Sequence, residues 1–379
     1  MMKDGRYLKR EKFSPVTYAL LAAALFVTFV VCLFIGRADI SFRETVTILW
    51  NEIRGLPAAS GNHRNIIWGV RMPGVLCVML VGASLSLCGA AMQGLLRNPL
   101  ADGSIMGVSS GAALGAVIAM ATGFTLPGFG FGGVTVMAMA FAFGSLLLIL
   151  GIAYALDRSL STNSIILIGV IFSMFISSLI SIIVTFASRH TQSLSFWTLG
   201  SFSGANYQHA LLLLAALAIC GGVILRFAPE LNAFAVGEDN ARHIGVNVKR
   251  VKLMILFAVS ALIGVCVSVA GIISFVGLVM PHIARMLVGP NHKRLLPASL
   301  FSGAIFLLLA DLLSRRLLPV KLPIGVVTSI VGGVAFIIIF YRTGKARLKR
   351  CCKGIILRCV MAILPRWTIC LFLCGKANG

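Results

Sequence analysis

The sequence predicts an all-α integral membrane protein with about ten transmembrane helices. Of its 379 residues, 59% are hydrophobic and 12% are charged, too little charge to cover the surface of a soluble protein of this length. Apolar runs of about 20 residues, the length that crosses a bilayer as a helix, recur along the chain. Because these runs are continuous rather than alternating, they exclude a transmembrane β-barrel.

Ten apolar runs define the expected spans, which together make one polytopic domain over residues 16–342. They are Val16–Gly36, Arg71–Ala91, Ser104–Ala121, Val134–Leu156, Asn163–Ala187, His209–Phe227, Val251–Ile272, Phe275–Val288, Leu296–Leu313 and Pro323–Tyr341. An even number of spans places both termini on the same side of the membrane.

The net charge of +22 lies mainly in the short connections between the apolar runs. Most of the 33 Lys and Arg residues fall on the side that the two termini share, which is typical of cytoplasmic loops. We therefore expect a multi-pass protein of the bacterial plasma membrane with both termini in the cytoplasm. Strong basicity can also indicate nucleic-acid binding, but charges placed at span ends argue against it.

Three segments are not expected to be spans. Residues 1–15 form a basic cytoplasmic tail. The stretch Arg37–Val70 is amphipathic, and we expect an interfacial helix on the outer face. Residues 343–379 form a basic, Cys-rich tail in which two arginines would make a full span expensive, so we expect an interfacial or disordered appendage.

A weak internal repeat pairs the second expected span with the seventh. Gly82, Ser86, Gly89 and Pro99 recur, at one constant offset, as Gly264, Ser268, Gly271 and Pro281. Five spans of offset would give the two copies opposite orientations, as in inverted-repeat transporters. Chance matches among small residues are common in membrane helices, so the repeat is a hypothesis at this point.

Two patterns of small residues indicate helix contacts. Glycines at every fourth position predict a bare ridge on the third span: Gly103, Gly107, Gly111 and Gly115. Such a ridge serves close helix packing, or sliding of helices in a gated pathway. A polar stripe on the fifth span comprises Ser173, Ser177, Ser181 and Thr185. It is expected to line a pathway or to bond a neighbouring helix, and the sequence favours neither.

The sequence indicates that the energy for any transport comes from another protein. Asp311 is the only carboxylate expected near the membrane interior, whereas ion-coupled transporters and channels usually carry buried carboxylates. An ion-coupled secondary transporter or channel is therefore the weaker alternative. The chain has no GxxxxGK[ST] motif, so it is not expected to bind ATP through a P-loop. Its cysteines lack metal-type spacing and its six histidines are scattered, so neither a metal site nor an enzyme is expected.

The longest internal cytoplasmic connection, Leu231–Lys252, predicts two short helices broken at Gly237 and Gly245. Two short helices make a compact lobe, to which a separate ATPase could dock. The alternative is an ordinary cytoplasmic loop.

The chain resembles the permeases of iron-siderophore, heme and vitamin B12 ABC importers. The resemblance rests on four stretches: Arg71–Ala112 (with RMP, LVGASLSLCGAAMQ, NPLA and GVSSGA), Gly237–Val246, Gly271–His282 (GIISFVGLVMPH) and Ala310–Thr328. Together they cover most of the chain before residue 342.

This resemblance implies a type II ABC importer permease architecture of about ten helices with an inverted repeat. It implies a homodimer or pseudodimer with the pathway at the interface, embedded in membrane lipid. It also implies two cytoplasmic ATPase subunits, which would hold ATP and Mg²⁺, and an external substrate-binding protein. The chain itself would bind no cofactor. The substrate would be an iron(III)-siderophore, heme or a cobalamin-type compound.

The resemblance also assigns residues. The binding protein is expected to dock at Arg71 and Arg315, assisted by Arg316, although the second docking arginine of the family is Gly74 in this chain. Coupling to the ATPase is expected at the lobe of residues 231–246, which we call the coupling lobe. Its expected contact residues are Leu231, Phe234, Gly237, Glu238, Ala241, Arg242 and Gly245.

Overall fold

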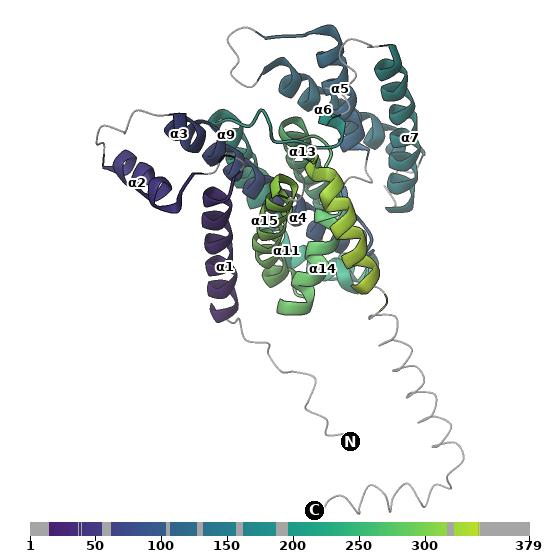
Figure 1. Cartoon of the computed structure of the whole chain (residues 1–379). Coiled ribbons are helices and arrows are strands. Elements are labelled where there is room, and N and C mark those ends of the chain that lie inside the picture. Colours follow the sequence, from purple (N-terminus) through teal and green to yellow (C-terminus); the bar gives the residue numbers. More distant parts are fainter. Residues whose placement is uncertain are drawn as a thin grey trace, which may run out of the picture. The chain divides into compact units, whose positions relative to one another are not determined.

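The computed structural model describes residues 15–36, 38, 40–54, 62–103, 107–126, 132–156, 162–186, 196–316, 322–339 and 341. Within these ranges all regular structure is helical (Figure 1). The chain divides into two compact units, residues 1–332 and 333–379, and the candidate site lies in the first. Both expected tails, residues 1–15 and 343–379, lie outside the described residues except for Pro15.

The helices follow one another from α1 to α15, with two π-helical segments. The first half contains α1 (Pro15–Phe34), α2 (Phe42–Ile53), α3 (Asn62–Arg64), η1 (Asn65–Arg71), α4 (Met72–Leu95), α5 (Val108–Thr122), α6 (Gly132–Leu156) and α7 (Thr162–Phe186). The second half contains α9 (Tyr207–Ala216), η3 (Leu217–Gly221), α10 (Gly222–Arg226), α11 (Ala228–Val236), α12 (Glu238–His243), α13 (Val248–Ala270), α14 (Val276–Val288) and α15 (His292–Arg316). A further apolar helix covers Ile324–Ile339.

Every expected span falls on an apolar helix or on a continuous series of helices. In the described part of the chain, 7 of these are long and apolar enough to cross a membrane. The other three, Val108–Thr122, Val276–Val288 and Ile324–Ile339, are shorter. The all-helical membrane fold is confirmed, whereas ten crossings remain a prediction. The expected amphipathic helix between the first two spans is α2.

The third expected span begins later than the glycine spacing suggests. Gly107 has a φ of 73° and precedes the first residue of α5, and Gly123, with a φ of 67°, ends the helix. A left-handed residue cannot continue a right-handed helix, so Gly103 and Gly107 lie outside α5. The prediction of one continuous ridge over all four glycines is therefore wrong, because only Gly111 and Gly115 lie on this helix.

The centre of the first unit is α4, nearly all of which is buried. It packs against α13, α14 and α15, and α15 lies along it (Figure 1). By contrast, few residues of α1 and α7 are buried. In a membrane protein such surfaces face lipid or another subunit. α4 therefore lies at the centre of the helix bundle, and α1 and α7 lie at its periphery.

Glycines allow the central helices to approach at backbone distance. A Cβ added to Gly82 of α4 would lie 2.5 Å from the carbonyl oxygen of Gly303 in α15. One added to Gly89 would meet the backbone of Gly277 in α14. In lipid, the hydrophobic effect does not drive helices together, because the surrounding tails are also apolar. Small residues at a helix crossing allow close van der Waals contact, which stabilises the association instead.

The expected repeat has a structural counterpart. α4 and α13 are both long, buried helices, and each is followed by a shorter helix, α5 or α14. The residue before each short helix is left-handed: Gly107 with a φ of 73° and Phe275 with a φ of 69°. Gly107 and Phe275 do not stand at the constant offset of the glycine and serine matches, so the sequence repeat itself stays a prediction.

Candidate functional site

The coupling lobe consists of two short helices, as expected. α11 ends at Gly237, whose φ of 136° and ψ of 149° turn the chain sharply into α12. Gly245, with a φ of 90°, follows α12. Asn247 then caps α13, because its side chain accepts a hydrogen bond from the Arg250 amide at 3.1 Å. Both glycines occupy backbone conformations that other residues rarely adopt, which fixes the lobe as a defined shape rather than a flexible loop.

The lobe has a buried base and an exposed apolar tip. Leu231, Phe234 and Ala241 are fully buried and belong to the central hydrophobic core. Val236 and Ile244, at the ends of the two short helices, are 71% and 72% exposed. Large apolar side chains exposed on a lobe outside the expected spans are typical of a protein interface.

A buried ion pair fastens α12 to α13. The Lys252 ammonium lies 3.0 Å from Glu238 Oε1, and Lys252 is only 1% exposed. A charge buried to this degree requires an opposite charge close by. Glu238 therefore has a structural partner on a membrane helix. Arg242 and Asp239, by contrast, form an exposed pair at 3.8 Å, which contributes little.

A second attachment joins α11 to α15. Asn232 Oδ1 accepts hydrogen bonds from the His292 amide at 2.8 Å and from the His292 ring at Nδ1, 2.9 Å away. The Asn232 amide donates to Asn291 Oδ1 at 3.0 Å. His292 is buried, and its ring packs so closely on α4 that a Cβ at Gly94 would lie 2.3 Å from Nε2. The lobe thus touches the first residue of α15 through a bidentate contact.

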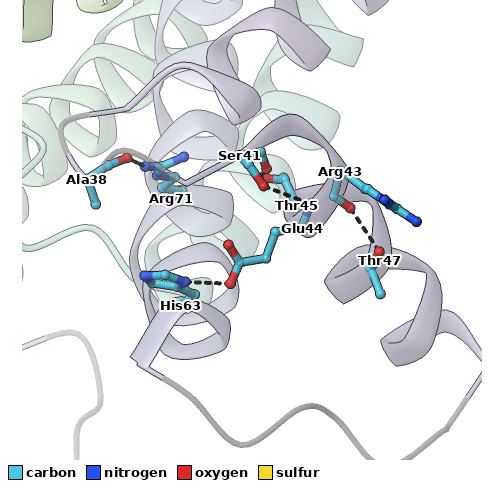
Figure 2. A network of polar contacts seen from close by, with 8 residues as sticks. All are labelled: Ala38, Ser41, Arg43, Glu44, Thr45, Thr47, His63 and Arg71. Carbon is cyan, nitrogen blue, oxygen red and sulfur yellow. Dashed lines mark hydrogen bonds and ion pairs between the residues drawn. The ribbon is translucent and has the colours of Figure 1, made fainter.

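At the opposite end of these helices, Arg71 is turned inward. It is 5% exposed, and its guanidinium donates to the carbonyl oxygens of Leu33 and Phe34 at 3.4 and 3.2 Å and to that of Ala38 (Figure 2). These carbonyls belong to the end of α1 and the residues after it, where a cation compensates unpaired acceptors. Direct docking of a binding protein on Arg71 would require an accessible head group, and in this structure that head group is buried. Gly36 leaves room for it, since a Cβ there would lie 2.4 Å from Cζ.

Arg315 and Arg316 end α15 on the side where Arg71 lies. Arg315 pairs with Asp311, one turn earlier on the same helix, and Asp311 is buried. Arg316 is exposed. Of the three expected docking arginines, Arg316 presents the most accessible side chain.

Within the described residues, the hydroxyls of the polar stripe bond to the backbone of α7 itself. Ser173, Ser177, Ser181 and Thr185 each donate to the carbonyl oxygen four residues earlier on α7, at 2.8 to 2.9 Å. Ser177, Ser181 and Thr185 are exposed. Because each hydroxyl already donates a hydrogen bond within its own helix, it can face either apolar groups or water. The stripe therefore suits a surface that faces another subunit or a water-filled pathway.

The remaining glycines pack between helices. Gly111 and Gly115 of α5 face α6, where a Cβ would lie 2.4 Å from Ser145 Oγ and from the Met137 carbonyl oxygen, respectively. Gly107 packs on α6 and α7 through Ile149 and Phe172, and Gly103 packs on Ile263 of α13.

Sequence reasoning did not identify Lys252, Asn232 or His292 as parts of the site. Lys252 ends the expected cytoplasmic connection, and its burial depends on the position of Glu238 in space. Asn232 and His292 belong to different elements and are joined only by the fold. A cationic residue in the second turn of a long apolar helix, beyond those at its start, is the one signal that could point to Lys252.

Comparisons with known proteins agree with this architecture. The FecCD transport family matches residues 24–342. The uncharacterized ABC transporter permease protein YvrB of Bacillus subtilis is 40% identical over 81% of this chain and 88% of its own length. The molybdate import system permease protein MolB of Haemophilus influenzae is 33% identical over 85% of this chain and 94% of its own length. The vitamin B12 import system permease protein BtuC of Klebsiella pneumoniae is 38% identical over 75% of this chain and 85% of its own length.

A solved structure assigned to the metal-chelate type of ABC transporter, in an inward-facing conformation, superposes with a TM-score of 0.76. It is 31% identical and covers 87% of this chain and 100% of its own. ABC importer permeases work with a separate ATPase subunit, where ATP is hydrolysed, and with a substrate-binding protein. The chain belongs to the FecCD transport family and is an integral membrane permease of an ABC importer, in bacteria a protein of the inner membrane.

Proposed function

We propose that two copies of this chain form the membrane channel of an importer for a metal chelate or a similar compact complex. An iron(III)-siderophore, heme or a cobalamin-type compound, delivered by an external binding protein, is the proposed substrate. In support, one relative is a vitamin B12 permease and a structural neighbour is of the metal-chelate type. Another relative carries molybdate, so oxyanions belong in any substrate test.

The observation that carries the proposal is the double attachment of the coupling lobe. Its α12 is fastened to α13 by the Glu238–Lys252 pair, and its α11 is fastened to α15 by Asn232 and His292. A lobe held at two points moves as one body with the membrane helices, whereas a loop would absorb the motion. The exposed Val236 and Ile244 offer the apolar contact for an ATPase that binds ATP and Mg²⁺.

The proposed dimer places α7 at the subunit interface. This helix exposes a polar stripe and large apolar side chains, including Met174 and Phe175. Two such helices facing each other would bury the apolar side chains and line a central pathway with hydroxyls. Oxidation of Ser177→Cys in membranes should then give a disulfide-linked dimer, whereas Ala23→Cys on the exposed face of α1 should not.

The proposed orientation puts the coupling lobe and both termini in the cytoplasm and the ends of α1 and α15 outside. The distribution of Lys and Arg supports this direction. External docking is assigned to Arg315 and Arg316. Arg71, which is buried, would act indirectly by holding the end of α1 against η1 and α4.

Transport by reconstituted protein tests the proposal. The permease is assembled in proteoliposomes with an ATPase and a binding protein from the same importer. Uptake of radiolabelled ferric siderophore, heme, cobalamin and molybdate is measured with ATP, and separately with only a proton or sodium gradient. The proposal expects ATP-dependent uptake of one of the chelates. Uptake driven by an ion gradient without ATP would contradict it, and ATP-dependent uptake of molybdate alone would contradict its substrate class.

A further inference from the structure

The helix α2 has two faces of different character. One face is packed: Thr45 and Ile48 are buried, and Ile48 joins a small hydrophobic cluster with Ile67 of η1. The opposite face exposes a row of large apolar side chains at four-residue spacing. Phe42, Val46 and Trp50 are 69%, 42% and 52% exposed, and they lie one above another along the helix. A row of exposed apolar side chains on a surface helix indicates that another protein or a membrane covers this face.

The charges of α2 are sorted between the two faces. Both of its acidic residues are paired with the neighbouring segment: Glu44 contacts the His63 ring at 2.5 Å, and Glu52 accepts two hydrogen bonds from Arg64, at 2.7 and 2.9 Å. Figure 2 shows Glu44 turned toward His63, with Arg43 extending away from it. The pKa of the Glu52 carboxyl is lowered, mainly by the hydrogen bond from Arg64. This carboxylate therefore stays ionised, and the Arg64 guanidinium compensates its negative charge.

The exposed face therefore carries apolar and cationic side chains. Arg43 is exposed beside Phe42. Arg54 lies over the Trp50 ring, with Cζ 4.3 Å from the ring centroid. Arginine that covers an aromatic ring keeps its charge at the surface while its stem packs on apolar carbon. Trp and Arg side by side are typical of the level at which a bilayer meets water.

The row begins next to the end of α1. The Phe34 ring, at the end of α1, stacks on the Phe42 ring with centroids 4.5 Å apart. α1 is an apolar helix of 20 residues, few of which are buried within the subunit. Because 20 helical residues match the thickness of the hydrocarbon core, we expect the end of α1, and with it the start of α2, at the bilayer surface. The Arg71 contacts to the residues after α1 hold this corner in place.

We propose that the exposed face of α2 is a binding surface for the membrane itself, with Phe42, Val46 and Trp50 inserted below the headgroups. Arg43 and Arg54 bind the phosphates of anionic phospholipids. An acidic protein partner would match the two arginines equally well. The lipid surface is favoured because the first residue of the row, Phe42, stacks on Phe34 at the end of the apolar helix α1, which has the length of a membrane span. This inference does not depend on which substrate the permease carries.

Fluorescence of the full-length permease in nanodiscs tests the insertion. The bilayer contains phosphatidylcholine and phosphatidylglycerol, with or without bromine atoms near the headgroup end of the acyl chains. The parent protein is Trp68→Phe/Trp367→Phe, which keeps Trp50 and Trp197 as its tryptophans. Bromolipid should quench its emission, and the further change Trp50→Phe should remove most of the quenching. Trp197→Phe, which changes a partly buried tryptophan of the main core, should retain it. Equal quenching of the parent protein and its Trp50→Phe variant would overturn the proposal.

Binding of anionic headgroups by Arg43 and Arg54 is tested by varying the fraction of anionic lipid in the nanodiscs. Raising the phosphatidylglycerol fraction should deepen quenching of Trp50 in the wild type but not in Arg43→Glu/Arg54→Glu. Arg226→Glu, a change at an exposed arginine of α10, should behave as wild type. If aqueous iodide reaches Trp50 freely in nanodiscs, and bromolipid does not, lipid is not the occupant and a protein partner is the better account.

Discussion

The ammonium of Lys252 lies 3.0 Å from the Glu238 carboxylate and is almost completely buried, so the second turn of α13 is attached directly to α12. α13 is one of the two long buried helices at the centre of the unit. If the ATPase binds the coupling lobe as proposed, this ion pair is one route by which a displacement of the lobe would reach the centre of the permease. The same lobe contacts α15 through the hydrogen bonds between Asn232 and His292. The lobe is thus linked to α13 by an ion pair and to α15 by neutral hydrogen bonds.

Replacing Glu238 by Gln should destabilise the permease. The change leaves the buried Lys252 charge with less compensation. We expect a loss of about 2 kcal/mol, less than for fully buried pairs because Glu238 retains contact with water. The unfolding midpoint of the purified protein in detergent measures the loss. Asp239→Asn is the matched control, since its carboxylate is highly exposed and makes only a long contact to Arg242. Equal shifts for the two variants would contradict the buried pair.

Asn232→Ala should uncouple ATP hydrolysis from uptake. Without Asn232 Oδ1, His292 loses both hydrogen bonds that tie the start of α15 to the lobe. We expect substrate transported per ATP to fall about fivefold or more, within the usual range of coupling energies, while basal ATPase activity persists. Transport and hydrolysis are measured in the same proteoliposomes.

Asn240→Ala provides the control for this route, because the exposed Asn240 side chain donates to the Val236 carbonyl within the lobe and, among the described residues, has no hydrogen bond to α15. His292→Ala should resemble Asn232→Ala, and the double variant should be no worse than either single one. Additive losses in the double variant would show that the two residues act separately.

The sequence predicted the membrane fold and the two helices of the lobe because those depend on local features. Hydrophobic length locates the spans, and Gly237 and Gly245 mark the breaks in the lobe. Arg71 shows where local reasoning fails. Its position before a long apolar run is typical of an arginine at the water interface. Its actual partners are carbonyl groups at the end of α1, more than thirty residues earlier, which no spacing rule connects to it.

The glycine pattern was misleading for a similar reason. Spacing of four residues is compatible with a helix, but a backbone with positive φ at Gly107 starts the helix later. Only the fold decides whether a glycine serves helix packing or a turn. For the stripe on α7, the sequence favours neither a pathway nor a contact with a neighbouring helix. In the described residues its hydroxyls bond to the α7 backbone, and both uses remain predictions.

Gly303→Ala should weaken the contact between α15 and α4. The added Cβ would lie 2.4 Å from the Gly82 carbonyl oxygen and 2.3 Å from Ser86 Cβ, both part of a central helix that cannot move freely. Overpacking of this kind costs about 1–3 kcal/mol. The unfolding midpoint should fall, whereas Gly144→Ala on α6, where a Cβ meets no neighbour within 4 Å, should leave it unchanged or raise it. A stable Gly303→Ala protein would mean that the two helices separate more easily than their packing indicates.

The last prediction separates a structural role of Arg315 from a docking role. Asp311 is buried and pairs with Arg315 one helical turn away, so Arg315→Glu would place two carboxylates together at the end of α15. We expect this variant to accumulate poorly in the membrane, as measured by quantitative immunoblotting. The double variant Asp311→Asn/Arg315→Gln removes both charges and should restore accumulation. Normal accumulation of Arg315→Glu would refute the structural role.

Arg316 provides the complementary test, because its side chain is exposed at the same helix end. Arg316→Glu should leave accumulation unchanged but weaken association with the substrate-binding protein, measured by surface plasmon resonance on the permease in nanodiscs. A contact between exposed charges is screened by salt, so the difference from wild type should shrink as ionic strength rises. If Arg316→Glu binds as wild type at low salt, docking does not use the end of α15. A loss of binding that is equally large at all salt concentrations would instead indicate a local rearrangement, and would also contradict the electrostatic contact.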